Sequence, residues 1–263
     1  YSSGWANDQR VFFVAEFSQP ITSLDVIVDK GEAVANQGQG KVVYARANVD
    51  AKEPVYVKVA LSPTSIENAK MNMQAELPGW DFEGTVAQAD QAWEKALAKI
   101  DMESSCEKTK KIFYTALYHT MVAPSEFCDV NGDYYGADQK MHKGEGFVNY
   151  TTMSCWDTYR SAHPLMTLIH PDMMKDMMQA FVTIYKQQGK LPVWHLMGCE
   201  TDCMVGNPGV IIVADGLNKG YIEDKEGAFE ALKNSVMLDE RGQDLRKQYG
   251  RSEEHTSELQ SLL

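Results

Sequence analysis

The segment Leu191–Gly206 carries the strongest chemical signal in this sequence of 263 residues, because it sets one acid, Glu200, among apolar, aromatic and small residues. A carboxyl group in such surroundings loses hydration. That loss disfavours its charged form, so the group can keep a proton near neutral pH. A protonated carboxyl group is what general-acid catalysis requires. The same pattern also fits a structural acid that is partly buried where a helix begins.

Two tryptophans with polar neighbours add a second signal. Asp157 follows Trp156 and lies three residues after Ser154, so it can act as a capping acid for a helix. It can equally accept a hydrogen bond from a sugar hydroxyl while Trp156 stacks on the ring. Trp194, just before the Glu200 segment, leaves the same two alternatives. Flat apolar rings beside acids are the chemistry of a carbohydrate site.

No residue is assigned as a metal ligand from the sequence. The histidines lack the spacing of an HExxH motif. The stretch 129–133 fails as a calcium loop, because the sixth and twelfth positions hold Tyr134 and Lys140 instead of glycine and a bidentate acid. A β-turn with Asn131 and Gly132 at its centre is the prediction for this stretch.

Composition excludes some classes of partner. The net charge is −12 and 44% of the residues are hydrophobic, which is typical of a globular protein. No basic stripe is visible, so we expect no nucleic-acid partner. No apolar run is long enough to span a bilayer, so we expect no membrane span.

The first part of the chain predicts antiparallel β-sheet, as part of a sandwich. Four short stretches are rich in β-branched and aromatic residues and are separated by turn formers. In the last of them, Val57, Val59 and Leu61 alternate with other residues, which predicts one buried face. The four stretches are 11–17, 23–28, 41–46 and 55–61.

The period then changes to that of helices. Residues 64–67 and 104–107 have the spacing of capping boxes, and Trp93 lies on an apolar stripe that predicts a core position. Further helices are expected from the spacing at 154–168, 171–189, 209–219 and 226–238. Strands and helices do not alternate, which argues against a doubly wound α/β fold and favours a helical barrel or bundle.

Both ends of the sequence suggest a piece of a longer protein. The opening residues, Tyr1–Trp5, read like sequence from the middle of a domain. Residues 251–261 resemble the translation of a sequencing-library adapter. We therefore expect the natural chain to break off near Gly250, and we exclude 251–263 from the fold as a non-native tail.

Several stretches in one order resemble glycoside hydrolase family 92, the calcium-dependent exo-acting α-mannosidases. They are 4–6, 62–69, 76–80, 113–118, 150–160, 163–164, 191–194 and 200–204. The resemblance covers about residues 1 to 250. It implies a multidomain β + α protein, with a partial antiparallel β-sandwich, then linker helices and a partial (α/α)6 barrel. The expected boundaries are 1–62, 63–102 and 103–250, followed by the tail 251–263.

The resemblance also implies roles for single residues. Glu200 matches the general acid of the family, and Trp156 and Asp157 match residues that hold the terminal mannose. We expect Trp194 to bind substrate as well. The family inverts the anomeric configuration with a second carboxylate from a later motif, which nothing after Glu200 matches. We therefore expect this chain alone to show no turnover.

The remaining expectations follow from the same resemblance. The cofactor would be Ca²⁺, with ligands mostly outside this chain, and the substrates would be α-mannosides or mannose-containing N-glycans. The location would be periplasmic or secreted. Two alternatives stay open. One is another (α/α)6-barrel glycosidase, α-glucosidase-like or trehalase-like. The other is a non-catalytic carbohydrate-binding protein on the same scaffold.

Overall fold

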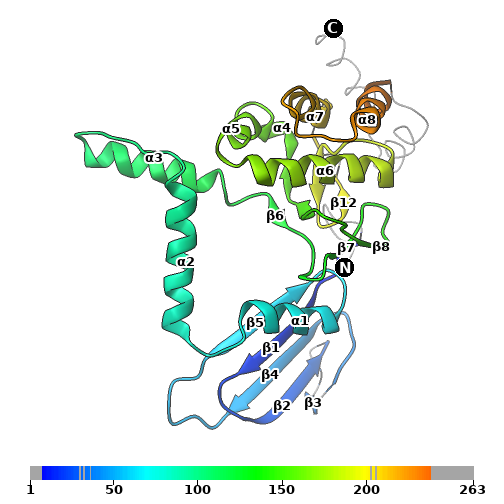
Figure 1. The fold of residues 1–263 in the computed structure, drawn as a ribbon. Coiled ribbons are helices and arrows are strands. Elements are labelled where there is room, and N and C mark those ends of the chain that lie inside the picture. The colour runs from blue at the N-terminus through cyan, green and yellow to red at the C-terminus, as the bar shows by residue number, and fades with distance from the viewer. Residues whose placement is uncertain are drawn as a thin grey trace.

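A computed structural model describes residues 8–29, 31, 33–35, 37–201, 203–204 and 206–237 of the chain. A β-rich half comes first and a helical half follows, joined by two helices (Figure 1). Residues 4–6, part of the family resemblance, and the adapter-like tail 251–263 lie outside the described residues.

Five antiparallel strands build the β-rich half. They are β1 (Phe12–Phe17), β2 (Ile21–Val28), β3 (Ala33–Ala35), β4 (Val43–Val49) and β5 (Val57–Ser62). In one sheet β1 pairs with β5, and in the other β2 lies between β3 and β4. The sequence predicts all of them except β3. That strand has only three residues among turn formers, too few to show an alternating pattern.

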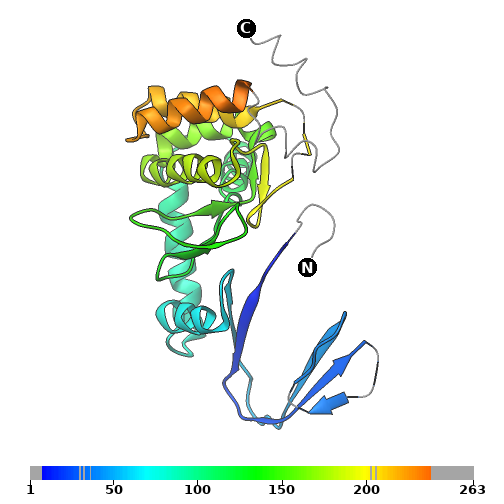
Figure 2. The same cartoon turned by 90° about the vertical axis from the view of Figure 1, so that its right-hand side faces the viewer.

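The apolar face of the β1–β5 pair is exposed, contrary to the prediction of a buried face. Val59 is 53% and Leu61 60% exposed. The alternating residues Lys58 and Ser62 lie on the opposite face, which helix α1 (Ile66–Glu76) covers. The second sheet is inclined away from this pair (Figure 2). The alternating apolar residues of β5 therefore form a face suited to burial, but no described residue covers that face.

Helix α1 begins one residue later than the capping box predicts. Ser65 is the N-cap, and its hydroxyl accepts a hydrogen bond from the backbone N–H of Asn68. The hydroxyl of Thr64 instead donates to the carboxylate of Asp129, in the helical half. The contact to Asp129 thus diverts Thr64 from capping.

Asp129 is the centre of a polar network that joins the two halves. Its side chain is buried, at 3% exposure. Besides the Thr64 hydroxyl, its carboxylate accepts from the hydroxyl of Ser62 at 2.9 Å, from the amide of Asn68 at 3.0 Å and from that of Asn72 at 2.7 Å. The donors come from β5, α1 and the link between them, so one carboxylate anchors both elements.

Helices α2 (Phe82–Leu97) and α3 (Glu107–His119) connect the halves, and α2 runs from the β-rich half to α3 (Figure 1). Asp81 caps α2 by accepting from the N–H of Gly84 at 2.9 Å. The capping box predicted at 104–107 is wrong, because Cys106 is the N-cap of α3 and makes no side-chain cap.

Trp93 on α2 is not a core residue of this chain. It is 39% exposed, although its stripe predicts burial. Its ring packs on that of Tyr118 from α3, with the centroids 4.6 Å apart. It also lines an apolar cavity of about 280 Å³ together with Met121 and Met173. The stripe thus packs against only a few neighbours, and none of the residues of α2 is buried.

Short strand pairs open the helical half. β6 (Ser125–Glu126) pairs with β9 (Tyr150–Thr151), and β7 (Asp133–Tyr135) pairs with β8 (Met141–Lys143). The turn before β7 runs from Asp129 to Gly132, whose N–H donates to the carbonyl of Asp129 at 2.7 Å. Its centre is therefore one residue earlier than predicted. Gly132 follows the centre with a φ of +85°, which suits glycine.

Five helices follow: α4 (Cys155–Thr158), α5 (Ala162–Ile169), α6 (Pro171–Gln188), α7 (Pro208–Asn218) and α8 (Lys225–Met237). The fully buried α6 residues Met178 and Phe181 lie in a core that includes side chains of α5, α7 and α8. The helix predicted at 154–168 is two helices. Pro164 lacks an N–H and is tolerated only in the first turn of a helix, so α5 begins anew at Ala162. None of the described helices combines the length and the apolar character needed to cross a bilayer.

Candidate active site

A small sheet brings the predicted site residues together. It consists of β10 (Met153–Ser154), β11 (Trp194–Leu196) and β12 (Cys199–Glu200), with β11 in the middle. Ser154 is paired with Trp194, and His195 is paired with Glu200. The sheet therefore sets the start of α4, with Trp156 and Asp157, beside the hairpin that carries Trp194 and Glu200.

The hairpin is closed by a two-residue turn. Met197 has a φ of +50° and Gly198 a φ of +79°, the combination that suits the twist of a tight hairpin. The N–H of Thr201 and its hydroxyl both bind the carbonyl of Trp194, at 3.1 and 2.8 Å. These bonds define the register, which places Glu200 directly opposite His195.

Glu200 is buried, with 3% of its surface exposed. Its Oε2 accepts a hydrogen bond from the N–H of Val193 and its Oε1 one from the N–H of Trp194, both at 2.9 Å. Burial favours the neutral carboxyl group, whereas two N–H donors favour the carboxylate. Burial and hydrogen bonding therefore act in opposite directions on the charge of this side chain.

Two titratable neighbours share this environment. Burial raises the pKa of the Cys155 thiol well above its ordinary value, and the charge of Glu200 adds to the effect. Burial lowers the pKa of His195 to about 4, and neither ring nitrogen has a hydrogen-bond partner. Both groups are thus neutral near pH 7, so neither adds a charge beside Glu200.

Trp156 and Asp157 lie in the single turn of α4. Trp156 is half-buried and Asp157 is exposed. Asp157 accepts a hydrogen bond from the hydroxyl of Ser154, which itself makes no side-chain cap to α4. Asp157 therefore does not form the predicted capping box. Its exposed carboxylate retains the capacity to accept hydrogen bonds from a ligand.

Arg160 belongs to the same surface and was missed by the sequence reasoning. Its guanidinium lies 4.9 Å from the ring centroid of Trp156 and 4.8 Å from that of Tyr159. The spacing of four residues from Trp156 within the helix predicted at 154–168 was the available signal, although in the structure α4 ends at Thr158 and Arg160 follows it in a turn. The guanidinium therefore lies within cation–π distance of both rings.

Calcium, implied by the family resemblance, finds no matching donor set. Among the described residues, no three side chains of His, Cys, Asp or Glu converge on one point. Asp129 and Asp133 come nearest to a calcium-loop pattern. Their oxygens already accept hydrogen bonds, including those from Asn68, Asn72 and Asn131. The described residues do not fit this ion, and we assign it no step in the reaction.

Comparison with known proteins gives a consistent result. The model of the glycosyl hydrolase family 92 catalytic domain matches residues 68–260. Among solved structures, the family GH92 alpha-mannosidase BT3965 from Bacteroides thetaiotaomicron matches with a TM-score of 0.83 and 36% sequence identity, over 89% of this chain and 33% of that chain. The structure of the same mannosidase in complex with mannoimidazole matches with a TM-score of 0.82 and 35% sequence identity, over 89% of this chain and 32% of that chain.

A second protein of the same family gives a similar match. The family GH92 inverting mannosidase BT2199 from Bacteroides thetaiotaomicron VPI-5482 has a TM-score of 0.78 and 27% identity, over 90% of this chain and 33% of that chain. The chain thus spans about a third of the length of these proteins. No curated protein sequence matched the chain.

Proposed function

Since this chain belongs to glycosyl hydrolase family 92, we propose that the intact protein is an exo-α-mannosidase that removes terminal α-linked mannose. The observation that supports the proposal is the β10–β11–β12 sheet, in which β10 leads into Trp156 and Asp157 and lies one strand away from the strand that carries Glu200. The complex of the similar mannosidase with mannoimidazole supports a mannose-containing substrate.

Glu200 is the proposed general acid. Its burial favours the protonated carboxyl group before the reaction, which is the form that can protonate the departing glycosidic oxygen. Once the proton has left, the N–H groups of Val193 and Trp194 stabilise the carboxylate that remains. The same pocket thus favours the reactant form by desolvation and the product form by hydrogen bonding.

The proposed stereochemical course is inversion. An inverting glycosidase needs a second carboxylate roughly 6.5–9.5 Å from the acid, so that a water molecule fits between this base and the sugar. We assign the base to sequence that follows this chain in the intact protein. The similar mannosidase BT2199 is an inverting enzyme, which supports the inverting course.

The sugar-binding surface is assigned to the start of α4 and to the hairpin. Trp156 offers a flat apolar face to the mannose ring, and the exposed carboxylate of Asp157 accepts hydrogen bonds from its hydroxyls. Trp194, half-buried and paired with Ser154, completes the apolar wall. The substrates are α-mannosides or mannose-containing N-glycans.

The wider setting is proposed on the same basis. We assign the described residues from 103 to 237 to the first part of an (α/α)6 barrel. Calcium, which favours oxygen ligands, would be bound by residues beyond those described. A periplasmic or secreted location is proposed from the family resemblance, and fractionation of the native cells would test it.

The proposal is tested by assaying the intact protein and this chain in parallel. We expect the intact protein to release mannose from an α-mannobioside in the presence of calcium, and to leave α-glucosides and trehalose uncut. We expect the 263-residue chain to release none. Hydrolysis of α-glucosides or trehalose in place of mannosides would contradict the substrate. Mannose binding without any hydrolysis would contradict the activity.

A further inference from the structure

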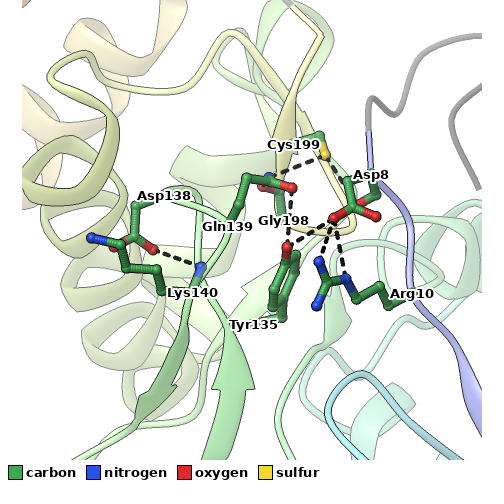
Figure 3. Close-up of polar contacts among 8 residues, drawn as sticks. All are labelled: Asp8, Arg10, Tyr135, Asp138, Gln139, Lys140, Gly198 and Cys199. Carbon is green, nitrogen blue, oxygen red and sulfur yellow. Dashed lines mark hydrogen bonds and ion pairs between the residues drawn. The ribbon is translucent and has the colours of Figure 1, made fainter.

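Gln139, in the turn between β7 and β8, contacts the tip of the β11–β12 hairpin that carries Glu200. The Nε2 of Gln139 donates a hydrogen bond to the carbonyl of Gly198 at 3.0 Å and lies 3.5 Å from the Sγ of Cys199. Figure 3 shows Gln139 reaching Gly198 and Cys199, the two residues that precede Glu200 in the sequence. The contact therefore fixes the backbone from which the proposed acid projects.

Gln139 occupies a backbone position that favours glycine. It lies in the turn between β7 and β8 with a φ of +62°, and its N–H donates to the carbonyl of Gly136 at 3.0 Å. A left-handed conformation has an energetic cost for any residue with a Cβ atom. The chain nevertheless has a long polar side chain at this position, and that side chain reaches the Glu200 hairpin. Strained residues of this kind gather at functional sites.

The segment that leads into β1 reaches the same point through Asp8, which contacts Tyr135 of β7. The buried hydroxyl of Tyr135 lies 3.0 Å from the carboxylate of Asp8 and 3.2 Å from the Oε1 of Gln139. Burial raises the pKa of Tyr135, so the hydroxyl keeps its single proton, which the carboxylate of Asp8 and the Oε1 of Gln139 share as acceptors. Arg10 holds Asp8 with bonds of 2.8 and 3.1 Å, and the thiol of Cys199 donates to the Asp8 carbonyl at 3.5 Å.

We propose that Gln139 is a positioning residue for Glu200, and that Tyr135 and Asp8 connect it to the β-rich half. The acid then reaches its working position only when the segment that leads into β1 is docked on the β7–β8 turn and the hairpin tip. This inference rests on the proposed role of Glu200. It adds a residue that acts on the acid through the backbone of Gly198 and Cys199.

The first experiment needs no catalytic activity. Hydrogen–deuterium exchange of segment 194–201 is measured in this chain for the wild type, Gln139→Gly and the control Lys140→Ala, whose side chain is exposed in the same turn. Glycine relieves the backbone cost at position 139 but removes the side chain. We expect exchange about fivefold faster in Gln139→Gly, the equivalent of one hydrogen bond, and no change in Lys140→Ala. Unchanged exchange in Gln139→Gly would overturn the proposal.

The second experiment uses the intact protein and an α-mannobioside. We expect Gln139→Gly to lower kcat about tenfold or more with KM unchanged. A site with a displaced acid still binds substrate, but it transfers a proton to the leaving oxygen poorly. Tyr135→Phe should give a smaller loss of the same kind. Wild-type kcat in Gln139→Gly would overturn the link to catalysis. If the wild-type intact protein releases no mannose, the proposed function fails, while the exchange measurement still decides whether Gln139 positions the hairpin.

Discussion

At the scale of single residues, the unusual feature is how polar groups are buried around Glu200. The carboxylate has N–H donors from Val193 and Trp194, whereas the ring of His195, opposite it in the hairpin, has no hydrogen-bond partner. A buried imidazole without a partner is stable only when it is neutral. The folded site should therefore be sensitive to acid through this histidine.

That sensitivity gives the first prediction. The pKa of His195 is about 4 in the folded chain and about 6.5 when unfolded, so the folded form binds the proton less readily. The stability contributed by the neutral ring is fully present above about pH 6.5 and is lost as the pH falls toward 4. This histidine should make the free energy of unfolding about 2 kcal/mol lower at pH 5 than at pH 8.

The substitution His195→Met tests it, because methionine is apolar and of similar length. In urea unfolding of this chain, the difference in unfolding free energy between pH 8 and pH 5 should shrink by about 2 kcal/mol. His119→Gln, at an exposed position, should leave that difference unchanged. An identical pH dependence in His195→Met and the wild type would contradict the prediction.

At the scale of elements, the network around Asp129 joins β5 and α1 to the helical half. Asp129→Ala would remove the acceptor of the Ser62 and Thr64 hydroxyls in a largely buried site, while the amides of Asn68 and Asn72 keep their other acceptors. We expect a loss of about 2–4 kcal/mol in unfolding free energy, measured with urea. Asp50→Ala removes an exposed carboxylate and should change it by less than about 0.5 kcal/mol. Equal urea midpoints of unfolding for Asp129→Ala and Asp50→Ala would show that the network around Asp129 does not stabilise the fold.

The elements also show what the sequence could predict. Long periodic stretches such as β1, α6 and α8 were placed within one or two residues, because the spacing of apolar residues follows the backbone period even where, as in β1, the apolar face is exposed. Capping was harder, because Thr64 and Ser154 bind distant or neighbouring carboxylates instead of helix N–H groups. Pro164 was a readable signal for the break before α5. The hydrogen bond from Gln139 to Gly198 spans 59 residues, and no local pattern reveals it.

At the scale of the whole molecule, the exposed apolar surfaces are the dominant feature. Phe13 and Leu61 face each other across the β1–β5 pair and are both 60% exposed. Uncovered apolar surface of this kind promotes association. The chain spans about a third of the length of similar mannosidases, and we expect the intact protein to cover this face.

The isolated chain should therefore self-associate. In sedimentation velocity at micromolar concentration we expect dimers or larger species, and Val59→Lys should shift the chain toward monomer, because a charge on the exposed face opposes burial. Thr115→Lys adds the same charge on α3, at an exposed position, and should leave the distribution unchanged. A monomeric wild type would contradict the prediction.

The role of Glu200 is tested most directly by varying the leaving group in the intact protein. An acid is needed when the departing group is a sugar, and it is not needed when that group is an activated phenol such as 2,4-dinitrophenol. We expect Glu200→Gln to lower kcat on an α-mannobioside by about 10²–10⁴-fold, while 2,4-dinitrophenyl α-mannoside is hydrolysed within about tenfold of the wild-type rate. Glu226→Gln, at an exposed position on α8, should match the wild type on both substrates. An equal loss on both substrates, or no loss on either, would contradict the assignment of Glu200 as the general acid.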